Sequence, residues 1–159
     1  MLQPPNTYLA QLNVARALDD LESPRLADFM AALDRVNDVA ERSAGFVWRL
    51  KSETGNATDI RAGDDDRFVV NMSVWETAAH LEHFVWNTIH ARVYEKKNKW
   101  FEALKTPHLV MWWVPVHHRP TVEEAMERLS DLTRQGSSGS AFGWEGLPNI
   151  KLWLSKRCA

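Results

Sequence analysis

The segment HFVWNTIHARVYEKKNKWF, residues 83–101, places a titratable ring among aromatic side chains. At about 100° per residue on a helical wheel, His90 falls in one arc with its apolar neighbours. Trp86 lies one turn before His90 and Tyr94 one turn after it, so the imidazole is enclosed if this stripe faces inward. A neutral imidazole there can ligate haem iron, or hold and release a proton near neutral pH. The alternative is a hydrogen-bonded histidine of the core.

Two further side chains are suited to hold a ligand beside His90. The amide of Asn13 offers two donors toward a ligand oxygen, and the indole of Trp75 stacks on a flat ring while donating one hydrogen bond. The structural alternative is that Asn13 satisfies a backbone group and Trp75 caps the core. His90, Asn13 and Trp75 are the candidate catalytic residues. The candidate ligand-binding residues are Trp48, Asn71, Trp86, Tyr94, Trp112 and His118.

Several of these candidates also have structural explanations. Trp112 and Trp113 are adjacent on a predicted strand and must point to opposite faces. His118 follows that strand, where it borders a pocket mouth or stabilises the loop. A second histidine group, His80 and His83 with Glu76, has helical spacing that could bind a metal, but a solvated helix start explains it better. We predict no metal site other than His90, should haem be bound.

Bulk composition excludes several functions. The chain has 159 residues, 45% of them apolar, which suits one domain with one core. Its 19 Lys and Arg against 21 Asp and Glu give a net charge of −2 without a basic stripe, so nucleic acid is not an expected partner. No apolar run approaches the roughly 20 residues of a membrane span. The segment MLQPPNTY, residues 1–8, lacks a basic region followed by an apolar one, so secretion is not expected. With one cysteine, Cys158, a cytoplasmic protein is expected.

The periodicity of the chain predicts alternating strands and helices. Residues 7–15 alternate as a strand, and residues 23–45 form a helix introduced by Ser23 and Pro24. The remaining predicted elements are strands 46–51, 67–75 and 109–116, helices 78–102 and 121–136, and a short strand in the AFGW segment, residues 141–144. This order is the α+β, ferredoxin-like βαββαβ fold with an added C-terminal helix. We expect one domain over residues 1–145 and a tail over 146–159.

One face of the predicted sheet mixes polar and aromatic side chains. This mixed face holds Gln11, Asn13, Arg49, Asn71, Ser73 and Trp75. Crossover helices cover one face of such a sheet, and we expect them to take the purely apolar one. A mixed face is poorly suited to solvent and well suited to wall a cavity. The pattern therefore predicts a homodimer whose sheets close over an interior ligand pocket.

With these residues laid out, the chain resembles the DUF3291 family, within the dimeric α/β-barrel superfamily that includes antibiotic-biosynthesis monooxygenases. The resemblance rests on the segments YLAQLNVAR, GFVWRL, ATDIR, VNMSVWET, FVWNTIHARV, WFEALKTPHLVMWWVP and HRPTVEEAMERL, which span roughly residues 7–144. The family pattern falls on Asn13, Trp48, Asn71, Trp75, His90, Trp100, Trp112, Trp113 and His118. The resemblance implies small homodimers that bind compact ligands between sheet and helices.

The same resemblance frames the expected function. Members of the superfamily include cofactor-free monooxygenases, haem-dependent enzymes and polyketide cyclases of secondary metabolism, and histidines on the helix that corresponds to residues 78–102 serve there as haem ligands or proton donors. The chain lacks a phosphate-binding glycine loop, a Gly-x-Ser-x-Gly motif and a dinucleotide fingerprint. We therefore expect a monooxygenase-like enzyme acting on a compact, largely apolar or aromatic metabolite without a nucleotide cofactor. The alternatives are a haem-dependent enzyme with His90 as axial ligand, a non-catalytic metabolite-binding dimer, and a purely structural dimer.

Overall fold

A computed structural model describes residues 1–151. Four strands, β1 (Thr7–Arg16), β2 (Phe46–Arg49), β3 (Phe68–Trp75) and β4 (Leu109–Pro115), form one antiparallel sheet in the order β2-β3-β1-β4. The helices are α1 (Ala27–Arg42), α2 (Ala78–Asn87), α3 (Ile89–Glu95) and α4 (Val122–Gln135). This order and sheet topology confirm the ferredoxin-like α+β fold with an added helix after the last strand.

Helix starts follow the expected capping chemistry. The hydroxyl of Thr77 accepts from the backbone N–H of His80 at 3.3 Å and begins α2. Thr121 accepts from the N–H of Glu124 at 3.1 Å and begins α4. Each bond satisfies one of the N–H groups that a helix start leaves unpaired. At Ser23 the side chain makes no capping bond, and a 3-10 turn, Pro24–Leu26, precedes α1.

The helix predicted over residues 78–102 is interrupted. Thr88 has an extended backbone, with φ −122° and ψ −173°, and separates α2 from α3. Its hydroxyl donates to the carbonyl of Phe84 at 2.6 Å and accepts from the N–H of His90 at 3.2 Å. Thr88 therefore satisfies the end of one helix and the start of the next. Beyond α3 the chain continues through a 3-10 turn, Lys97–Lys99.

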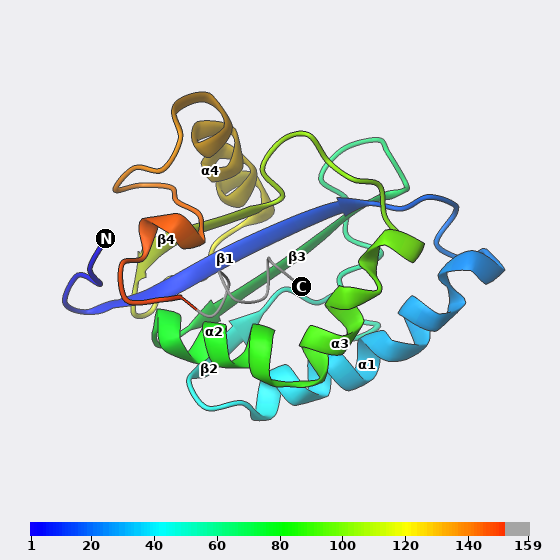
Figure 1. Ribbon diagram of the computed structural model, residues 1–159, viewed down its shortest axis with the longest axis horizontal. Coiled ribbons are helices and arrows are strands. Elements are labelled where there is room, and N and C mark those ends of the chain that lie inside the picture. Colours follow the sequence, from blue (N-terminus) through cyan, green and yellow to red (C-terminus); the bar gives the residue numbers. More distant parts are fainter. Residues whose placement is uncertain (152–159) are drawn as a thin grey trace.

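The two faces of the sheet are covered by different layers (Figure 1). Leu9 and Trp75 pack against α1 and α2, whereas Ala10, Leu12 and Val74 belong to the cluster that α4 covers. The polar residues of the mixed face alternate with that second set, so they lie beneath α1, α2 and α3. The expectation that the crossover helices cover the purely apolar face is wrong.

The physical reason is that the added helix can bury the apolar face itself. Leu12, Val74 and Trp112 on that face are 0–1% exposed, and Ala125 and Leu129 of α4 pack against the same cluster. The chain after β2 contributes further apolar side chains, namely Leu50, Ile60 and Ala62. A sheet face whose side chains are all apolar packs best against the apolar stripe of an amphipathic helix. The mixed face, which was expected to need a second copy, is in turn covered by α1, α2 and α3 of the same chain.

This burial gives a prediction for the oligomeric state. Because both faces of the sheet are covered within the described part of one chain, a homodimer would have to pair through helices or an edge strand. We expect sizing with light scattering to give the mass of a single chain, 18.3 kDa. A stable dimer would contradict the conclusion that the sheet and its cavity are closed within one chain.

The chain after α4 returns to the edge of the sheet. Phe142 pairs with Met111 of β4 through two backbone bonds of 2.8 and 2.9 Å, so the expected final strand is a single bridge. Leu147 and Ile150 pack into the same cluster as Leu9 and Trp75. The chain just after the 3-10 turn Trp144–Gly146 therefore contributes to this core. Cys158 and the rest of the tail lie outside the described residues.

Of the glycines, Gly45, between α1 and β2, leaves the least room for a Cβ atom. Its φ is +76°, and a Cβ there would lie 2.1 Å from Nδ1 of His80. We expect Gly45→Ala to lower the free energy of unfolding by more than the roughly 1 kcal/mol that a left-handed backbone alone costs an alanine. Gly55 is the matched control, because its φ is +87° with no atom within 4 Å of a Cβ. Equal losses in urea unfolding would contradict the steric argument.

Candidate functional site

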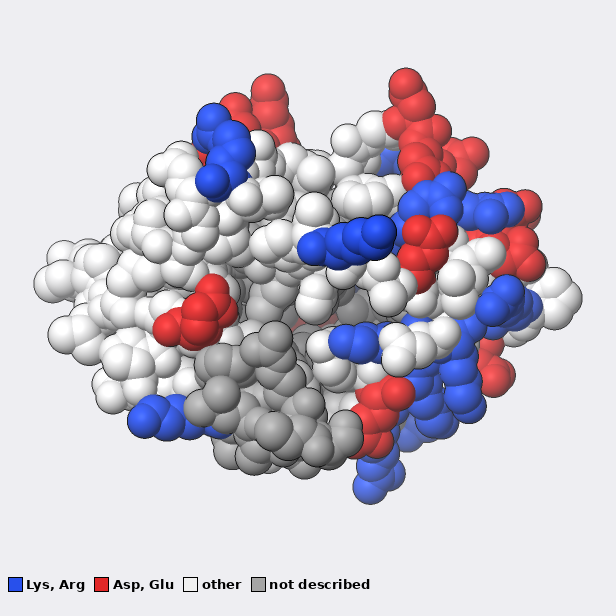
Figure 2. Space-filling view, turned by 45° about the horizontal axis from the view of Figure 1, so that its top comes forward, with Lys and Arg blue, Asp and Glu red and all other residues white. Residues whose placement is uncertain are grey.

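A cavity of about 1180 Å³ lies between the mixed face of the sheet and the helices. Apolar side chains of α1 form one wall, and residues of α2 and α3 form the opposite wall. The wall of α1 consists of Phe29, Leu33, Val36 and Ala40, which recur at helical spacing. Figure 2 shows the molecule hollowed near its centre, with lysine or arginine side chains beside the opening. A cavity of this size accommodates a compact organic molecule.

Phe29 and the chain after α3 close one end of this cavity. Phe29 packs against the rings of Trp100 and Phe101, with centroids 5.6 and 4.9 Å away. The chain there is tied to the end of β1, because Leu18 N–H donates to the Trp100 carbonyl at 2.8 Å. This packing fixes where α3 and the 3-10 turn stand relative to the sheet.

The break at Thr88 determines where the ring of His90 lies. Because the helix is interrupted there, Nδ1 of His90 can donate to the backbone carbonyl of Val85 at 3.1 Å. The proton then resides on Nδ1, and Nε2 carries the lone pair. Nε2 has no partner among the described residues, and the ring lines the cavity. Phe84 and Tyr94 flank the ring, with centroids 5.0 and 6.3 Å away.

The surroundings of His90 favour its neutral form. Burial lowers the pKa of His90 below its ordinary value of 6.5, and the hydrogen bond to the Val85 carbonyl opposes this only in part. Desolvation disfavours the charged imidazolium because little water reaches the ring to solvate it. A neutral ring with a free Nε2 can act as a proton acceptor or as a metal ligand.

The lowered pKa of His90 predicts a pH dependence of stability. Below pH 6.5 the unfolded chain binds a proton at residue 90 that the folded chain does not, so stability falls as the pH drops. The slope from one such group reaches about 1.4 kcal/mol per pH unit. We expect urea unfolding between pH 7.5 and pH 5.5 to show this loss and His90→Gln to reduce it. Burial, and to a lesser extent the charge of Lys97, also lower the pKa of His108. The slope measured for His108→Gln therefore shows how much of the pH dependence comes from residue 108. An unchanged slope in His90→Gln would contradict the assignment.

A row of hydrogen bonds runs along the cavity floor. Nε1 of Trp75 donates to the hydroxyl of Ser73 at 2.8 Å, and Nε2 of Gln11 donates to the same hydroxyl at 2.8 Å. Gln11 also donates to Oδ1 of Asn71 at 3.1 Å. The strand register explains the row, because Gln11 is opposite Ser73, and Asn13 is opposite Asn71. Buried polar groups of a sheet are satisfied by such cross-strand pairs.

Two amides of this floor are available to a ligand. Asn71 uses Oδ1 for Gln11, which leaves its NH₂ group without a partner among residues 1–151. Asn13, directly opposite, makes no side-chain hydrogen bond within the described part of the chain and also lines the cavity. Asn71 is exposed although it lies in an inner strand of the sheet, because the cavity opens above it. Paired amide donors of this kind bind a carbonyl or oxyanion oxygen.

Trp75 lies below the cavity floor and does not line it. Its side chain is fully buried, stacks on Phe84 with centroids 5.1 Å apart, and meets Phe46 edge to face. Its N–H is used by Ser73. Trp75 therefore supports the hydrogen-bonded row rather than stacking on a ligand.

Three other candidates lie away from the cavity. Trp48 lies on the opposite face from its neighbour Arg49, where it packs with the cluster beneath α4. Trp112 faces the same side, and its N–H donates to Glu124 at 3.0 Å. His118 bonds the other carboxylate oxygen of Glu124 at 2.6 Å, so the loop-stabilising role explains it. Trp86 and Tyr94 do line the cavity, with their rings 5.4 Å apart.

The histidines that begin α2 have structural partners. Nδ1 of His80 bonds the hydroxyl of Thr77 at 3.0 Å, and His83 is paired with Asn87 at 3.4 Å. Residues 1–151 contain no group of three or more His, Cys, Asp or Glu side chains placed to hold a metal ion. None of the helices within this range combines the length and apolarity that a bilayer crossing requires.

Sequence reasoning missed three cavity residues: Arg49, Lys97 and His108. Arg49 was placed on the mixed face but not in the site, and its Nε bonds Glu41 at 2.8 Å. Lys97 lies in the 3-10 turn after α3, and His108 lies in irregular chain before β4. A signal for Lys97 was present, because position 97 is seven residues after His90 and falls in the same arc of the helix predicted over residues 78–102.

Solved structures align with this chain at low sequence identity. A protein of unknown function from Nitrosomonas europaea aligns with a TM-score of 0.47 and 15% identity, over 74% of this chain and 99% of that one. SnoaB, a cofactor-independent oxygenase from Streptomyces nogalater, aligns with a TM-score of 0.46 and 12% identity, over 72% and 96%. A putative antibiotic biosynthesis monooxygenase from Nitrosomonas europaea gives 0.43 and 11%, over 72% and 91%.

The family assignment rests on the sequence. No curated protein matches the chain. The model of DUF3291, a domain of unknown function, matches residues 8–157, which is nearly the whole chain. The protein therefore belongs to the DUF3291 family.

Proposed function

We propose that the protein is an enzyme that removes a proton from a flat, largely apolar small molecule and oxygenates it without a nucleotide cofactor. The reaction takes place in the cavity between the sheet and the helices. His90 is the proton acceptor, and the amides of Asn13 and Asn71 bind the oxygen on which negative charge develops. Trp86 and Tyr94 contact the apolar part of the substrate.

The observation that carries this proposal is the state of His90. Its Nδ1 donates to the Val85 carbonyl, whereas Nε2 has no partner among residues 1–151, and the ring lines the same cavity as two amides whose NH₂ groups also lack a partner in this range. A histidine that served only the core would use both nitrogens or be surrounded by packed side chains. Abstraction of a proton next to a substrate oxygen requires a proton acceptor and hydrogen-bond donors for that oxygen. His90 and the two amides supply both within one apolar cavity.

The chemistry balances without an added reductant. Nε2 of His90 takes a proton from a ring CH₂ or OH group, and the amides hold the resulting electron-rich anion. Oxygen accepts four electrons when a CH₂ group becomes a carbonyl, so one oxygen atom enters the product and the other leaves as water. The substrate itself supplies the electrons. The apolar walls exclude bulk water from the anion.

The test is oxygen uptake with flat, electron-rich hydroxyarenes, followed by mass spectrometry of products formed under ¹⁸O₂. The proposal predicts catalytic uptake with one label in the product. It also predicts that N-phenyl-1-naphthylamine, a neutral fluorescent probe, binds saturably and competes with the substrate. Saturable binding of such compounds with no turnover would contradict the enzyme and favour a non-catalytic metabolite-binding protein. No saturable binding at all would contradict the site.

A haem-dependent reaction is the second candidate, and one observation favours it. A haem-ligating histidine commonly donates its other N–H to a backbone carbonyl, as His90 does to Val85. The residues fit the group: Nε2 of His90 would be the axial ligand, and the aromatic walls suit a planar macrocycle. Haem would supply oxygen activation at its iron. Haemin titration should then give a saturable Soret band that His90→Ala abolishes, and a featureless titration would remove this candidate.

A further inference from the structure

Three cavity residues gather around one ammonium group: Lys97 after α3, Tyr94 of α3, and His108 before β4. Nζ of Lys97 donates to the hydroxyl of Tyr94 at 2.7 Å and lies 4.0 Å from the centroid of its ring. These contacts hold the ammonium group in one place, half-buried beside the cavity. His108 is close enough that the charge of Lys97, together with burial, lowers the pKa of its imidazole.

The charge of Lys97 is not neutralised within the described part of the chain. The other cavity cation, Arg49, is paired with Glu41 and also donates to the carbonyl of Gly55 at 2.6 Å. Among residues 1–151, Lys97 makes no ion pair with a carboxylate. A half-buried ammonium group without a counter-ion has lost part of its hydration, and a bound anion compensates for this loss.

The carboxylates that share the cavity do not supply that anion. Glu102 accepts from Arg16 at 2.6 Å, and Glu145 accepts from Ser137 at 2.6 Å. Glu95 also lines the cavity, but it is exposed and makes no ion pair with Lys97 within the described residues.

The cluster lies beside the ligand-binding amides. The backbone carbonyl of His108 accepts from the N–H of Val14 at 2.8 Å, next to Asn13 on β1. Leu109, the next residue along, is opposite Asn13 in the β1–β4 register. Lys97 lines the same cavity as Asn13 and lies close to His108, so it can bind one end of a ligand whose oxygen contacts the amides.

We propose that the cavity binds an aromatic acid, whose carboxylate is held by Lys97 and whose flat apolar body fills the space between sheet and helices. This inference rests on the proposed function, because it assigns the substrate class of the same cavity. A single ammonium with a neighbouring hydroxyl suits a monoanionic carboxylate, whereas phosphate is bound by arginine forks or several backbone N–H groups.

A matched ligand pair tests the proposal. 2-Naphthoate and 2-naphthamide share one shape and differ in charge, and each is titrated against the full chain loaded with N-phenyl-1-naphthylamine. We expect naphthoate to displace the probe at about tenfold lower concentration, equivalent to about 1.4 kcal/mol. Lys97→Gln should remove this preference and leave the affinity for the neutral probe unchanged. Lys97→Arg should retain it.

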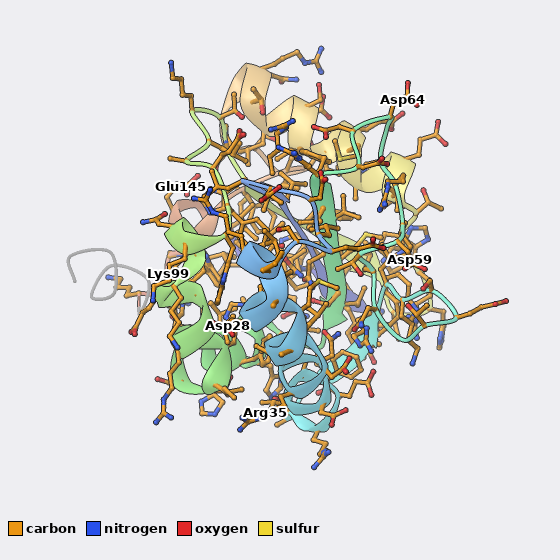
Figure 3. All side chains as sticks on the ribbon, turned by 90° about the vertical axis from the view of Figure 1, so that its right-hand side faces the viewer. Asp28, Arg35, Asp59, Asp64, Lys99 and Glu145 are labelled. Atoms are coloured by element: carbon orange, nitrogen blue, oxygen red, sulfur yellow. The ribbon has the colours of Figure 1, made fainter. Side chains whose placement is uncertain are left out.

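Lys99 provides the control, because it lies two residues away, is exposed and does not line the cavity (Figure 3). Lys99→Gln should behave as the unmodified protein. Equal displacement by naphthoate and naphthamide, or a preference that survives Lys97→Gln, would overturn the carboxylate site while the cavity proposal stands. Failure of the neutral probe to bind saturably would overturn both.

Discussion

His90→Gln is expected to lower kcat/KM by at least about a hundredfold, the usual contribution of a positioned general base. Glutamine is similar in size to histidine and keeps a hydrogen-bond donor for the Val85 carbonyl, but it cannot accept a proton near neutral pH. The affinity of the cavity for N-phenyl-1-naphthylamine should stay unchanged, because the apolar walls are the same. Steady-state kinetics with the substrate found by oxygen uptake measures the first quantity, and probe fluorescence measures the second.

The matched control is His83→Gln, on the exposed side of α2, where the ring contacts Asn87 and not the cavity. It should keep full activity. If His90→Gln also kept full activity, the role of His90 as proton acceptor would be refuted. Equal losses of activity and of probe affinity would assign His90 to the cavity wall instead.

Trp75→Ala is expected to lower the free energy of unfolding by about 3–5 kcal/mol, the usual cost of deleting a buried aromatic side chain. Trp75 is fully buried and stacks on Phe84, and its N–H is bonded to Ser73. The substitution leaves a hole beneath the cavity floor and removes one donor from the Ser73 hydroxyl. This loss is a large part of the roughly 5–15 kcal/mol that stabilises an ordinary domain.

Trp75→Phe separates packing from hydrogen bonding. It keeps most of the ring contact with Phe84 and loses the bond to Ser73, so the cost should fall to about 1–3 kcal/mol. Urea unfolding of both variants checks the order of the two losses. A Trp75→Ala protein as stable as the parent would contradict the placement of Trp75 in the core.

Local rules predicted the elements and their order well. Thr77 and Thr121 cap helices because their hydroxyls reach the N–H three residues on, which depends only on nearby sequence. Strand alternation likewise placed Asn13 and Asn71 on the opposite face of the sheet from Leu12 and Val70. Side chains on a strand alternate between the two faces whatever covers each of them.

The covering of each face could not be predicted in this way. Which helix packs on which side is a tertiary choice, and α4 took the apolar face that α1 and α2 were expected to cover. The bulge that places Phe46 on the same face as Trp75 depends on how β2 pairs with β3, which periodicity does not reveal. Thr88 is different, because a residue type that caps helices sits in the middle of an apolar stripe. That signal was present in the sequence.

The candidate site was predicted in part. His90, Asn13 and Asn71 do line one cavity, whereas Trp75 supports the floor and His118 belongs to the start of α4. Aromatic and histidine side chains have strong structural uses, so residue type alone does not separate the two roles. Lys97 was missed because a charged side chain near the end of an amphipathic helix usually faces solvent, although position 97 falls in the same arc as His90.

The absorption spectrum of bound 7-hydroxycoumarin tests the central claim most directly, because its phenol and phenolate forms absorb at different wavelengths. At pH 6.5 the free probe is chiefly the phenol. If His90 accepts the proton and the amides of Asn13 and Asn71 hold the oxyanion, the charge of that oxyanion stabilises the protonated ring against the burial that lowers the pKa of His90 in the empty cavity. The probe bound to the parent protein then shows the phenolate band, and the probe bound to His90→Gln shows the phenol band. Phenol bands in both proteins, or phenolate bands in both, would contradict the assignment of His90 as the proton acceptor of this cavity.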